Sequence, residues 1–432
     1  MSSTYGKYYR MITFGESHGK AVGVVIDGIK PGIELTRENI QKELDRRKPG
    51  QSSVTTQRKE EDKIEILSGV FNGKTLGTPI CMVVYNKDAD SGKYNNIKEI
   101  FRPGHADYTF LAKYGIRDYR GGGRASGRET LARVAAAAIA KKTLNQKGIE
   151  IISYVKEIAG IKAQKIDFSQ INKNSVKCPD KDAAKKMEEK ILELKKEGDS
   201  AGGIVELIVK NCPAGLGDPV FDKLNADIAK ALMSIGSVKG VEIGSGFESA
   251  KLKGSENNKL KNSAGGISGG ISNGEDIIAR VAVKPTSSIS KEQESFDIHG
   301  NMKKIKIEGR HDPCICPRIV PVVEAMVALV LFDNLLEQDQ ISKNQDIKTI
   351  REKIDNIDNQ FFLLLANRQD LVKEISKLKS KLGKEITDVK REKEILKNKN
   401  ELAKELGLDS ELINKIFKSI IEYSKKTQKK IK

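Results

Sequence analysis

The sequence predicts an α+β domain followed by a separate all-helical domain. Three observations lead to this prediction. Short β-like runs and helical segments are mixed through the first 340 residues, without the regular βαβ alternation of a doubly wound sheet. Glycine and proline are concentrated there, since every proline lies at or before Pro321 and only Gly383 and Gly407 follow residue 340. Beyond that point apolar residues recur every three or four positions, which is typical of helices.

Composition narrows the class of protein. At ~150 residues per domain, 432 residues indicate two or three domains. The 76 Lys and Arg exceed the 59 Asp and Glu, and the net charge of +17 favours an anionic partner: nucleic acid, a lipid surface or a phosphorylated small molecule. Pro321 and Glu324 interrupt the longest apolar run, and the N-terminus has no apolar signal core, so we expect no membrane segment. The five scattered cysteines lack a zinc spacing; we expect reduced thiols, no metal and a cytoplasmic location.

The first domain is expected to cover residues 1–338 and to alternate strands with helices. β-branched runs predict strands at residues 22–26, 79–84, 204–209 and 277–283. Helical patterns occupy residues 129–144, 183–196, 220–235 and 320–336. Two glycine-dense loops, residues 119–128 and 264–270, lie between these elements. Because functional groups concentrate on loops held by a rigid scaffold, we expect the site there.

A polar linker, residues 339–345, is expected to lead into a helical domain at residues 346–432. The apolar period predicts one helix over about residues 346–382, roughly 55 Å long. A monomeric globule of this size cannot cover such a helix, so we expect it to pack against a second copy. Two shorter helices are predicted at residues 388–405 and 410–428.

Two histidines stand in glycine-framed turns, His18 in residues 15–19 and His105 in residues 101–108, where an imidazole can move protons near neutral pH. His299, in a polar stretch, is expected on the surface. In the loop 119–128, glycines let backbone N–H groups approach a phosphate that Arg124 and Arg128 can bind. This loop does not match the Walker pattern, so a nucleoside triphosphate site is not supported.

Taken together, several motifs resemble chorismate synthase over residues 6–336. They are residues 15–19, 101–108, 118–130, 238–244, 284–288 and 309–313. The resemblance implies a β-α-β sandwich that assembles as a tetramer. It also implies conversion of 5-enolpyruvylshikimate 3-phosphate to chorismate by 1,4-elimination of phosphate, with reduced FMN and no net redox change.

The resemblance also implies roles for individual residues. His18 would protonate the leaving phosphate, His105 the reduced flavin, and Asp312 would help a flavin nitrogen accept the ring proton. The implied substrate-anion residues are Arg47, Arg102, Arg128 and Arg310. The implied FMN contacts are Arg124, Ala125, Ser126, Gly236, Ser237, Gly269, Lys284, Pro285, Thr286, Ser287, Ser288 and Arg310.

Two departures from the family pattern stand out. Ser52 and Ser53 replace a glycine and an arginine common in the family, which removes one anion contact that reductase-competent members use for a nicotinamide cofactor; Arg58 is the candidate substitute. The resemblance allows NADPH only as a reductant of the flavin. Ala125 replaces a serine and removes one side-chain hydrogen bond to the cofactor.

The helical tail carries cations where a purely structural helix would not. Arg368 falls on the apolar stripe between Leu365 and Leu371, and a cation aimed into a bundle needs a buried anion. The tail resembles the all-helical chorismate mutase family over residues 346–428. The matching polar positions are Arg351, Arg368, Lys379, Asp388, Arg391, Glu392, Ser424 and Gln428.

That resemblance implies a Claisen rearrangement of chorismate to prephenate without a covalent intermediate. The three arginines would position the carboxylates or nearby polar groups, Lys379 and Gln428 would bond the ether oxygen, and Glu392 would hold the hydroxyl. One arginine would cross from the partner's long helix, so the sites would belong to a dimer.

The sequence thus predicts a bifunctional shikimate-pathway enzyme, a lyase fused to an isomerase, that acts on small anionic substrates as a homo-oligomer. One alternative keeps the synthase and gives the tail only an oligomerisation or regulatory role. Another, nucleic-acid binding, rests on net charge alone, because no recognised motif appears and basic residues are interleaved with acids. We therefore expect neither nucleic acid nor membrane as a partner.

Overall fold

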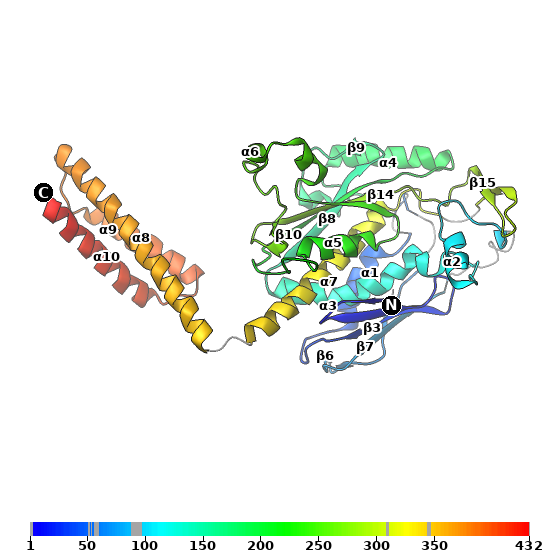
Figure 1. Cartoon of the computed structure of the whole chain (residues 1–432), viewed down its shortest axis with the longest axis horizontal. Helices are drawn as coiled ribbons and strands as arrows, with labels where there is room; N and C mark the ends of the chain where they lie inside the picture. The colour runs from blue at the N-terminus through cyan, green and yellow to red at the C-terminus, as the bar shows by residue number, and fades with distance from the viewer. Residues whose placement is uncertain are drawn as a thin grey trace. The chain divides into compact units, whose positions relative to one another are not determined.

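The computed structural model describes residues 3–50, 52, 54–55, 60–87, 97–307, 311–343 and 347–431. The chain divides into two compact units, Met1–Gln340 and Ile341–Lys432 (Figure 1). Helix α7 (Cys316–Lys343) continues through most of the predicted linker. The domain limits set from the sequence stay predictions.

Two antiparallel five-stranded sheets form the outer layers of the first unit. The first has the order β1-β2-β3-β7-β4, with bounds Thr4–Tyr5, Arg10–Phe14, Ala21–Asp27, Ile80–Tyr85 and Glu65–Ile66. The second has the order β11-β14-β10-β8-β9, with bounds Val238–Ile243, Ile277–Val283, Gly203–Lys210, Glu150–Ile158 and Ile161–Lys162. Three two-stranded hairpins are β5-β6 (Val70–Phe71, Lys74–Thr75), β12-β13 (Ile267–Ser268, Ile271–Ser272) and β15-β16 (Glu292–Phe296, Met302–Lys306).

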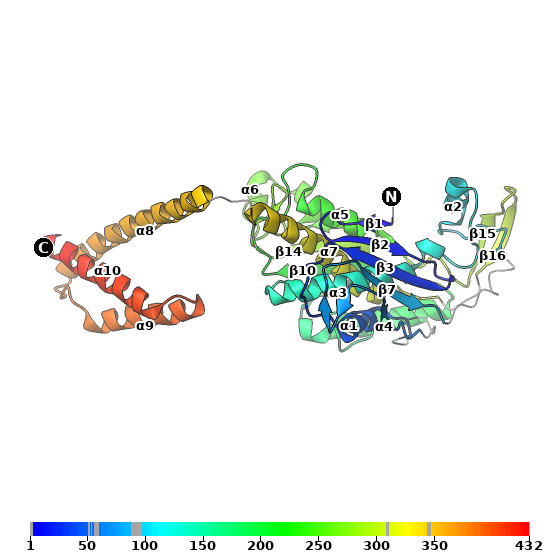
Figure 2. The same cartoon turned by 90° about the horizontal axis from the view of Figure 1, so that it is seen from below.

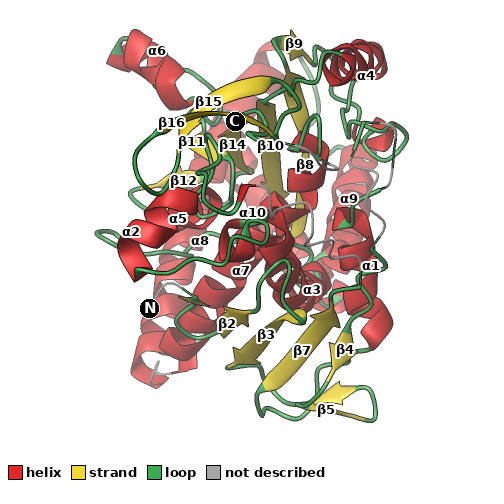
Figure 3. Ribbon diagram, turned by 90° about the vertical axis from the view of Figure 1, so that its right-hand side faces the viewer, coloured by secondary structure: helices red, strands yellow, loops and turns green. Residues whose placement is uncertain are grey.

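Helices α1 (Arg37–Arg47), α3 (Thr130–Gln146) and α7 lie between the two sheets, as Figure 3 shows. Figure 2 shows β2 and β3 of the first sheet side by side. The other helices of this unit are α2 (Asp107–Tyr114), α4 (Lys181–Lys196), α5 (Leu224–Met233) and α6 (Gly254–Asn257). Short 3-10 turns at Gly123–Ala125 and Gly127–Glu129 lead into α3, with others at Phe168–Gln170 and Gly246–Lys251. The predicted α+β class is confirmed, and its layers form a β-α-β sandwich.

Helix α7 is the centre of the core. Its stretch Cys316–Ile341 is long and apolar enough to cross a membrane, but 89% of its most apolar window is buried within the protein. Pro317 lies in its first turn, where a missing N–H removes no helical bond, whereas Pro321 lies inside the helix and cannot donate to the carbonyl four residues before it. The helix therefore begins at Cys316, earlier than the predicted residue 320, and it ends later than residue 336.

The carboxylate of Glu324 links the three helices between the sheets through ion pairs. Glu324 of α7 is 3% exposed and accepts two hydrogen bonds from Arg46 of α1, at 2.6 and 2.8 Å, and one from Lys141 of α3 at 2.7 Å. Burial opposes its ionisation, but Lys141 and Arg46 outweigh that effect and hold the pKa of Glu324 at about 2. The charge that interrupts the apolar run thus stays ionised inside the core.

The predicted strands in this unit are confirmed, and a second helix, besides α7, differs from its predicted bounds. Helix α5 begins at Leu224 and not at residue 220, because the preceding residues turn away after Gly217, whose φ is +104°. The Leu224 N–H donates to the carbonyl of Gly270 at 2.7 Å, which fixes where the helix starts. Phe221, counted as helical from sequence, is exposed in that turn.

The second unit contains α8 (Ile347–Lys381), α9 (Val389–Glu405) and α10 (Ser410–Ile431), so the three predicted helices are confirmed. At 35 residues, α8 is about 52 Å long. Helix α10 packs against both α8 and α9. Apolar side chains along α8 remain exposed, among them Ile350, Ile354, Ile357, Phe361, Leu364, Leu371, Ile375 and Leu378.

Candidate functional site

His105 contacts residues 284–288, the segment that the resemblance assigns to the cofactor. Its Nε2 is 2.7 Å from Oγ of Ser288, and Nζ of Lys284 donates to the carbonyl of Gly104 at 2.9 Å. Gly104 has a φ of +69°, and a Cβ there would lie 2.6 Å from Oγ of Ser287. Only glycine lets the histidine turn approach residues 284–288 this closely.

The surroundings of His105 keep its imidazole neutral. Burial and the nearby Arg102 lower the pKa of His105 to about 4, an effect that Asp107 opposes and that His311 and Lys284 reinforce. At neutral pH the ring therefore holds no extra proton in the free protein. Negative charge placed beside it would favour protonation.

His18 lies in the turn between β2 and β3 and faces the glycine loop, residues 119–128, that precedes α3. Its Nδ1 is 3.0 Å from Oγ of Ser17. A Cβ on Gly121 would lie 2.3 Å from the imidazole, and Gly121 has a φ of +76°. The loop can therefore cross the face of His18 only with glycine at this position.

A cavity of about 660 Å³ opens between these loops. Arg102, His105, Gly121, Arg124 and Ala125 are among its lining residues. This volume lies within the range of small-molecule sites. The structure thus brings one predicted catalytic histidine, one anion-binding arginine and two cofactor positions to the same space.

Arg102 is held in a fixed orientation. Its guanidinium makes two hydrogen bonds of 2.8 Å to the Asp107 carboxylate and one of 2.9 Å to the Gly121 carbonyl. Burial raises the pKa of Asp107, but the bonds and charge of Arg102 outweigh it and the pKa of this carboxyl is lowered. Asp107 is therefore the ionised partner that positions Arg102 at the cavity.

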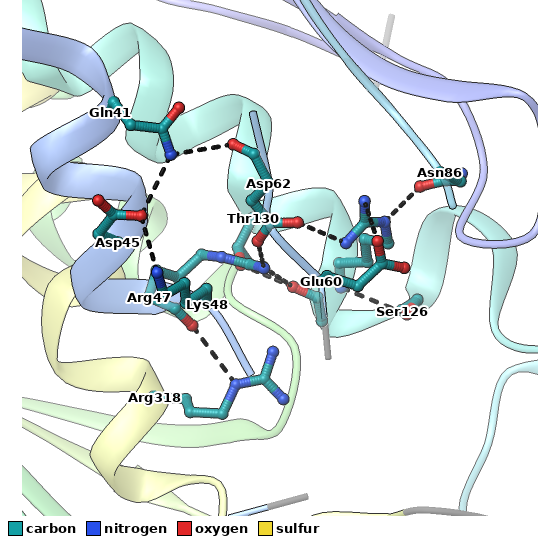
Figure 4. Close-up of polar contacts among 12 residues, drawn as sticks. Gln41, Asp45, Arg47, Lys48, Glu60, Asp62, Asn86, Ser126, Thr130 and Arg318 are labelled. Carbon is teal, nitrogen blue, oxygen red and sulfur yellow. Dashed lines mark hydrogen bonds and ion pairs between the residues drawn. The ribbon is translucent and has the colours of Figure 1, made fainter. Parts of the chain in front are cut away.

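Arg47, at the end of α1, and Arg128, at the end of the glycine loop, share one carboxylate. Asp62 accepts from Nη2 of Arg47 at 2.9 Å and from Nη1 of Arg128 at 2.8 Å (Figure 4). Arg47 also donates to the Gly127 carbonyl at 3.1 Å, and Arg128 donates to Asn86 at the end of β7. All three charged side chains are at least 96% buried.

Asp312 lies at the start of α7, where Arg318 bonds its carboxylate. Nε of Arg318 also donates to the Arg47 carbonyl at 3.5 Å. The structure therefore links the predicted catalytic aspartate to the Arg47 end of α1. Arg310, next to this turn, lies outside the described residues, as do Ser53 and Arg58.

The other residues predicted to bind the cofactor do not all lie in the same part of the unit. Gly236 lies close to the Ala125 carbonyl, and the Lys284 N–H donates to the Ser237 carbonyl at 2.9 Å. Ser126 accepts from the Arg128 N–H at 3.3 Å, and Arg124 bonds the Thr13 hydroxyl at 2.6 Å. Gly269 lies apart in the turn between β12 and β13, a turn that contacts the start of α5.

In the helical unit, several of the predicted polar side chains face inward. Nη1 of Arg368 donates to Oγ of Ser424 at 2.5 Å, and burial lowers the pKa of Arg368. Nζ of Lys379 donates to the Ile386 carbonyl at 2.7 Å. Oε1 of Gln428 is buried and has no hydrogen-bond partner within the described part of the chain. An unpaired buried acceptor is costly unless a ligand supplies a donor.

Other predicted residues of this unit are not brought to that interior. Asp388 caps α9 by accepting from the Arg391 N–H at 2.9 Å, while the Arg391 guanidinium pairs with Glu394 on the surface. Arg351 is exposed, 17 residues before Arg368 on α8 and so about 25 Å away.

The structure also reveals residues that the sequence reasoning missed. They are the partners of the predicted cations and anions: Asp62, Asp107, Arg318 and, in the helical unit, Lys425, whose Nζ is 3.1 Å from Oε2 of Glu392. Each pair joins residues from different segments of the chain or from a turn. The sequence shows the charges, but it carries no signal for the pairing.

Comparison with known proteins bears on this geometry. A family model described as Chorismate synthase matches residues 9–336. The chain belongs to the chorismate synthase family. The chorismate synthase of Methanosarcina mazei is 56% identical over 356 residues, covering 79% of this chain and 98% of the relative. That of Prochlorococcus marinus is 55% identical over 354 residues, covering 78% and 97%.

A solved structure entitled "Crystal Structure of Chorismate Synthase" aligns with a TM-score of 0.62 and 32% identity, covering 82% of this chain and 99% of that one. A second family model, Chorismate mutase type II, matches residues 350–429. The chain is therefore a chorismate synthase domain followed by a chorismate mutase type II domain.

Proposed function

We propose that the first unit converts 5-enolpyruvylshikimate 3-phosphate to chorismate by 1,4-elimination of phosphate, with reduced FMN as cofactor. The observation that carries this proposal is the cavity between the His105 turn and the glycine loop, lined by Arg102 and Arg124. Several arginine side chains line this cavity, and guanidinium groups suit a substrate with a phosphate and two carboxylates.

The residues present fit a flavin. Lys284, Ser287 and Ser288 supply polar groups along one segment, and the buried Oγ1 atom of the half-buried Thr286 has no hydrogen-bond partner among the residues described. Arg124, Ala125, Ser126, Gly236 and Ser237 would complete the contacts. When bound, reduced FMN supplies electron density to the breaking C–O bond and recovers it afterwards. NADPH would serve only as its reductant.

Side chains of the protein would transfer the protons and bind the anionic groups of the substrate. His18 would protonate the departing phosphate, and Arg47, Arg102 and Arg128 would hold the anionic groups of the substrate. His105 would protonate the flavin, and its neutral ring in the free protein is consistent with taking up a proton only beside an anion. Asp312, oriented by Arg318, would assist removal of the ring proton.

For the second unit we propose rearrangement of chorismate to prephenate. Arg368, Lys379 and the buried Gln428 support this proposal, because two cations and an amide N–H can stabilise the negative charge that develops on an ether oxygen. Arg351 is too far from Arg368 to share a site within one copy. The exposed apolar residues of α8 would therefore pack against a second copy, which supplies Arg351. The alternative is a tail that serves only assembly or regulation.

One experiment tests both activities. The full chain is incubated without oxygen with reduced FMN and 5-enolpyruvylshikimate 3-phosphate, and the products are separated. We expect prephenate; chorismate alone would exclude the mutase proposal, and unchanged substrate would exclude the synthase proposal.

Arg368→Ala then separates the mutase proposal from a purely structural tail. We expect it to abolish prephenate formation while chorismate still forms and the oligomeric state is unchanged. Lys373→Ala, at an exposed position on the same helix, is the control. Unchanged prephenate formation by Arg368→Ala would contradict the assigned site.

These proposals carry two expectations about setting. The substrates are small anions, and we expect the enzyme to act in the cytoplasm, which agrees with its five free cysteines. A tetramer of the first unit, as in the family, stays a prediction.

A further inference from the structure

The carboxylate between Arg47 and Arg128 is the most completely buried ionised group near the site. The Asp62 side chain is 0% exposed, and each of its oxygens accepts from a different arginine, at 2.9 and 2.8 Å. Glu60 lies 3.7 Å from Nη2 of Arg128 and is also buried. Figure 4 shows Asp62 at the centre of this cluster.

Two guanidinium groups held this close repel one another in a buried setting. Burial, together with Arg318 and Arg128, lowers the pKa of Arg47 to about 10, although Asp62 raises it. Asp62 is thus the main group that offsets the repulsion. Without it, both arginines would turn toward other partners or toward solvent.

The backbone around Asp62 is fixed from the helix that carries Arg47. Gln41 of α1 donates to the Asp62 carbonyl at 3.2 Å and accepts from the Ile64 N–H at 3.1 Å. Asp62 has a φ of +49°, in the left-handed region that Asp and Asn tolerate better than most residues. One helix therefore orients both the acid and one of its arginines.

Asp62 does not use all the donors of its two partners. Nε of Arg47 and Nη2 of Arg128 are buried and have no hydrogen-bond partner among the residues that the structure describes. A buried N–H without an acceptor destabilises the folded protein, because the group has lost its hydrogen bonds to water. An anion that reached these donors would recover that cost.

We propose that Asp62 is a positioning residue of the synthase reaction. It holds Arg47 and Arg128 at a fixed separation and leaves one donor of each for the anionic groups of the substrate. This inference rests on the proposed function of the first unit, in which these two arginines bind the substrate.

The test is steady-state kinetics of Asp62→Asn with 5-enolpyruvylshikimate 3-phosphate and saturating reduced FMN. Asparagine keeps the size and the left-handed backbone but loses the charge that orients two cations. We expect KM to rise roughly 10-fold or more, as for loss of a charged hydrogen bond, with kcat within about 3-fold of the wild type. Glu61→Gln removes the same charge from the exposed neighbouring residue and should leave both constants unchanged.

Asp62→Glu covers the case in which the asparagine variant does not fold. It keeps the charge and displaces the carboxylate by one methylene, so KM should rise while the melting temperature stays close to that of the wild type. An unchanged KM in the folded variants, or a fall in kcat alone, would overturn the inference. A lower KM would also overturn it, because Asp62 would then compete with the substrate. Inactivity of both the wild type and Glu61→Gln would instead reject the proposed synthase function.

Discussion

His105 allows a direct test of how burial controls the proton chemistry of this site. Its pKa is lowered to about 4, first by burial and then by Arg102. An unfolded chain would hold the same imidazole near its ordinary pKa of about 6.5. Between these two values the unfolded state binds more protons than the folded state, so the free energy of unfolding falls as the pH drops from about 6.5 toward 4.

The size of the effect follows from the two pKa values. At pH 8 the contribution is close to zero, because the imidazole is neutral in both states. At pH 5 it destabilises the fold by about 2 kcal/mol. His105→Gln removes this proton linkage and keeps a group that can bond Oγ of Ser288, so the variant should lose less stability than the wild type on acidification.

Titration by NMR measures the pKa itself. The chain has four histidines, so labelled imidazoles give few signals, and the one lost in His105→Gln is assigned to His105. We expect that signal to titrate near pH 4 in the free protein, and urea unfolding at pH 5 and pH 8 should show the stability difference. A midpoint at or above 6.5 would refute the argument that burial and Arg102 keep the ring neutral.

Three further predictions follow from contacts elsewhere. Glu324→Gln removes the more deeply buried of the two carboxylates that Arg46 and Lys141 share, the other being Glu43, and should lower the free energy of unfolding by about 3 kcal/mol in urea titrations; a loss below about 1 kcal/mol would contradict it. Gly121→Ala places a methyl group 2.3 Å from the His18 ring and should reduce chorismate formation at least ~10-fold. Gly32→Ala, also at positive φ but with open space around it, should keep full activity. Ile357→Lys puts a charge on the exposed apolar face of α8 and should shift the sedimentation coefficient toward smaller species and abolish prephenate formation, while chorismate still forms; unchanged sedimentation would exclude that face from assembly.

The helical unit was the most predictable part of the fold. The expected helix over residues 346–382 corresponds to α8, Ile347–Lys381, because an apolar period sustained over 35 residues leaves little choice of structure. Gly383 and Gly407, at positive φ, end α8 and α9 as the sequence indicates.

Prediction failed where tertiary contacts decide an element's limits. The apolar residues before Leu224 continue a helical pattern, yet the bond from its N–H to Gly270 starts the helix later. Helix α7 begins at Cys316 and not at residue 320, and the apolar pattern does not show that Pro317 belongs to its first turn, where a missing N–H removes no helical bond. Neither outcome can be read from local sequence.

In the candidate site, too, some residues could be predicted from the sequence and others could not. The histidines and arginines stand out because glycine turns frame them, and the structure places His105, Arg102 and Arg124 at one cavity. Their acidic partners could not be predicted. Asp62 and Arg128 are separated by 66 positions in the sequence, and Glu324 and Arg46 by 278. Only the folded chain therefore brings these charges together.

The position of α7 in the chain has a consequence for synthesis on the ribosome. Both large sheets are built from residues that precede Cys316, but the helix that fills the space between them comes last in the unit. A nascent chain that stops before Glu324 would lack one of the two acids that pair with Arg46 and Lys141, and it would lack most of the apolar helix at the centre of the interior. The first unit can therefore complete its core only as the tail begins to emerge, and until then its open layers would be exposed to aggregation or to chaperones.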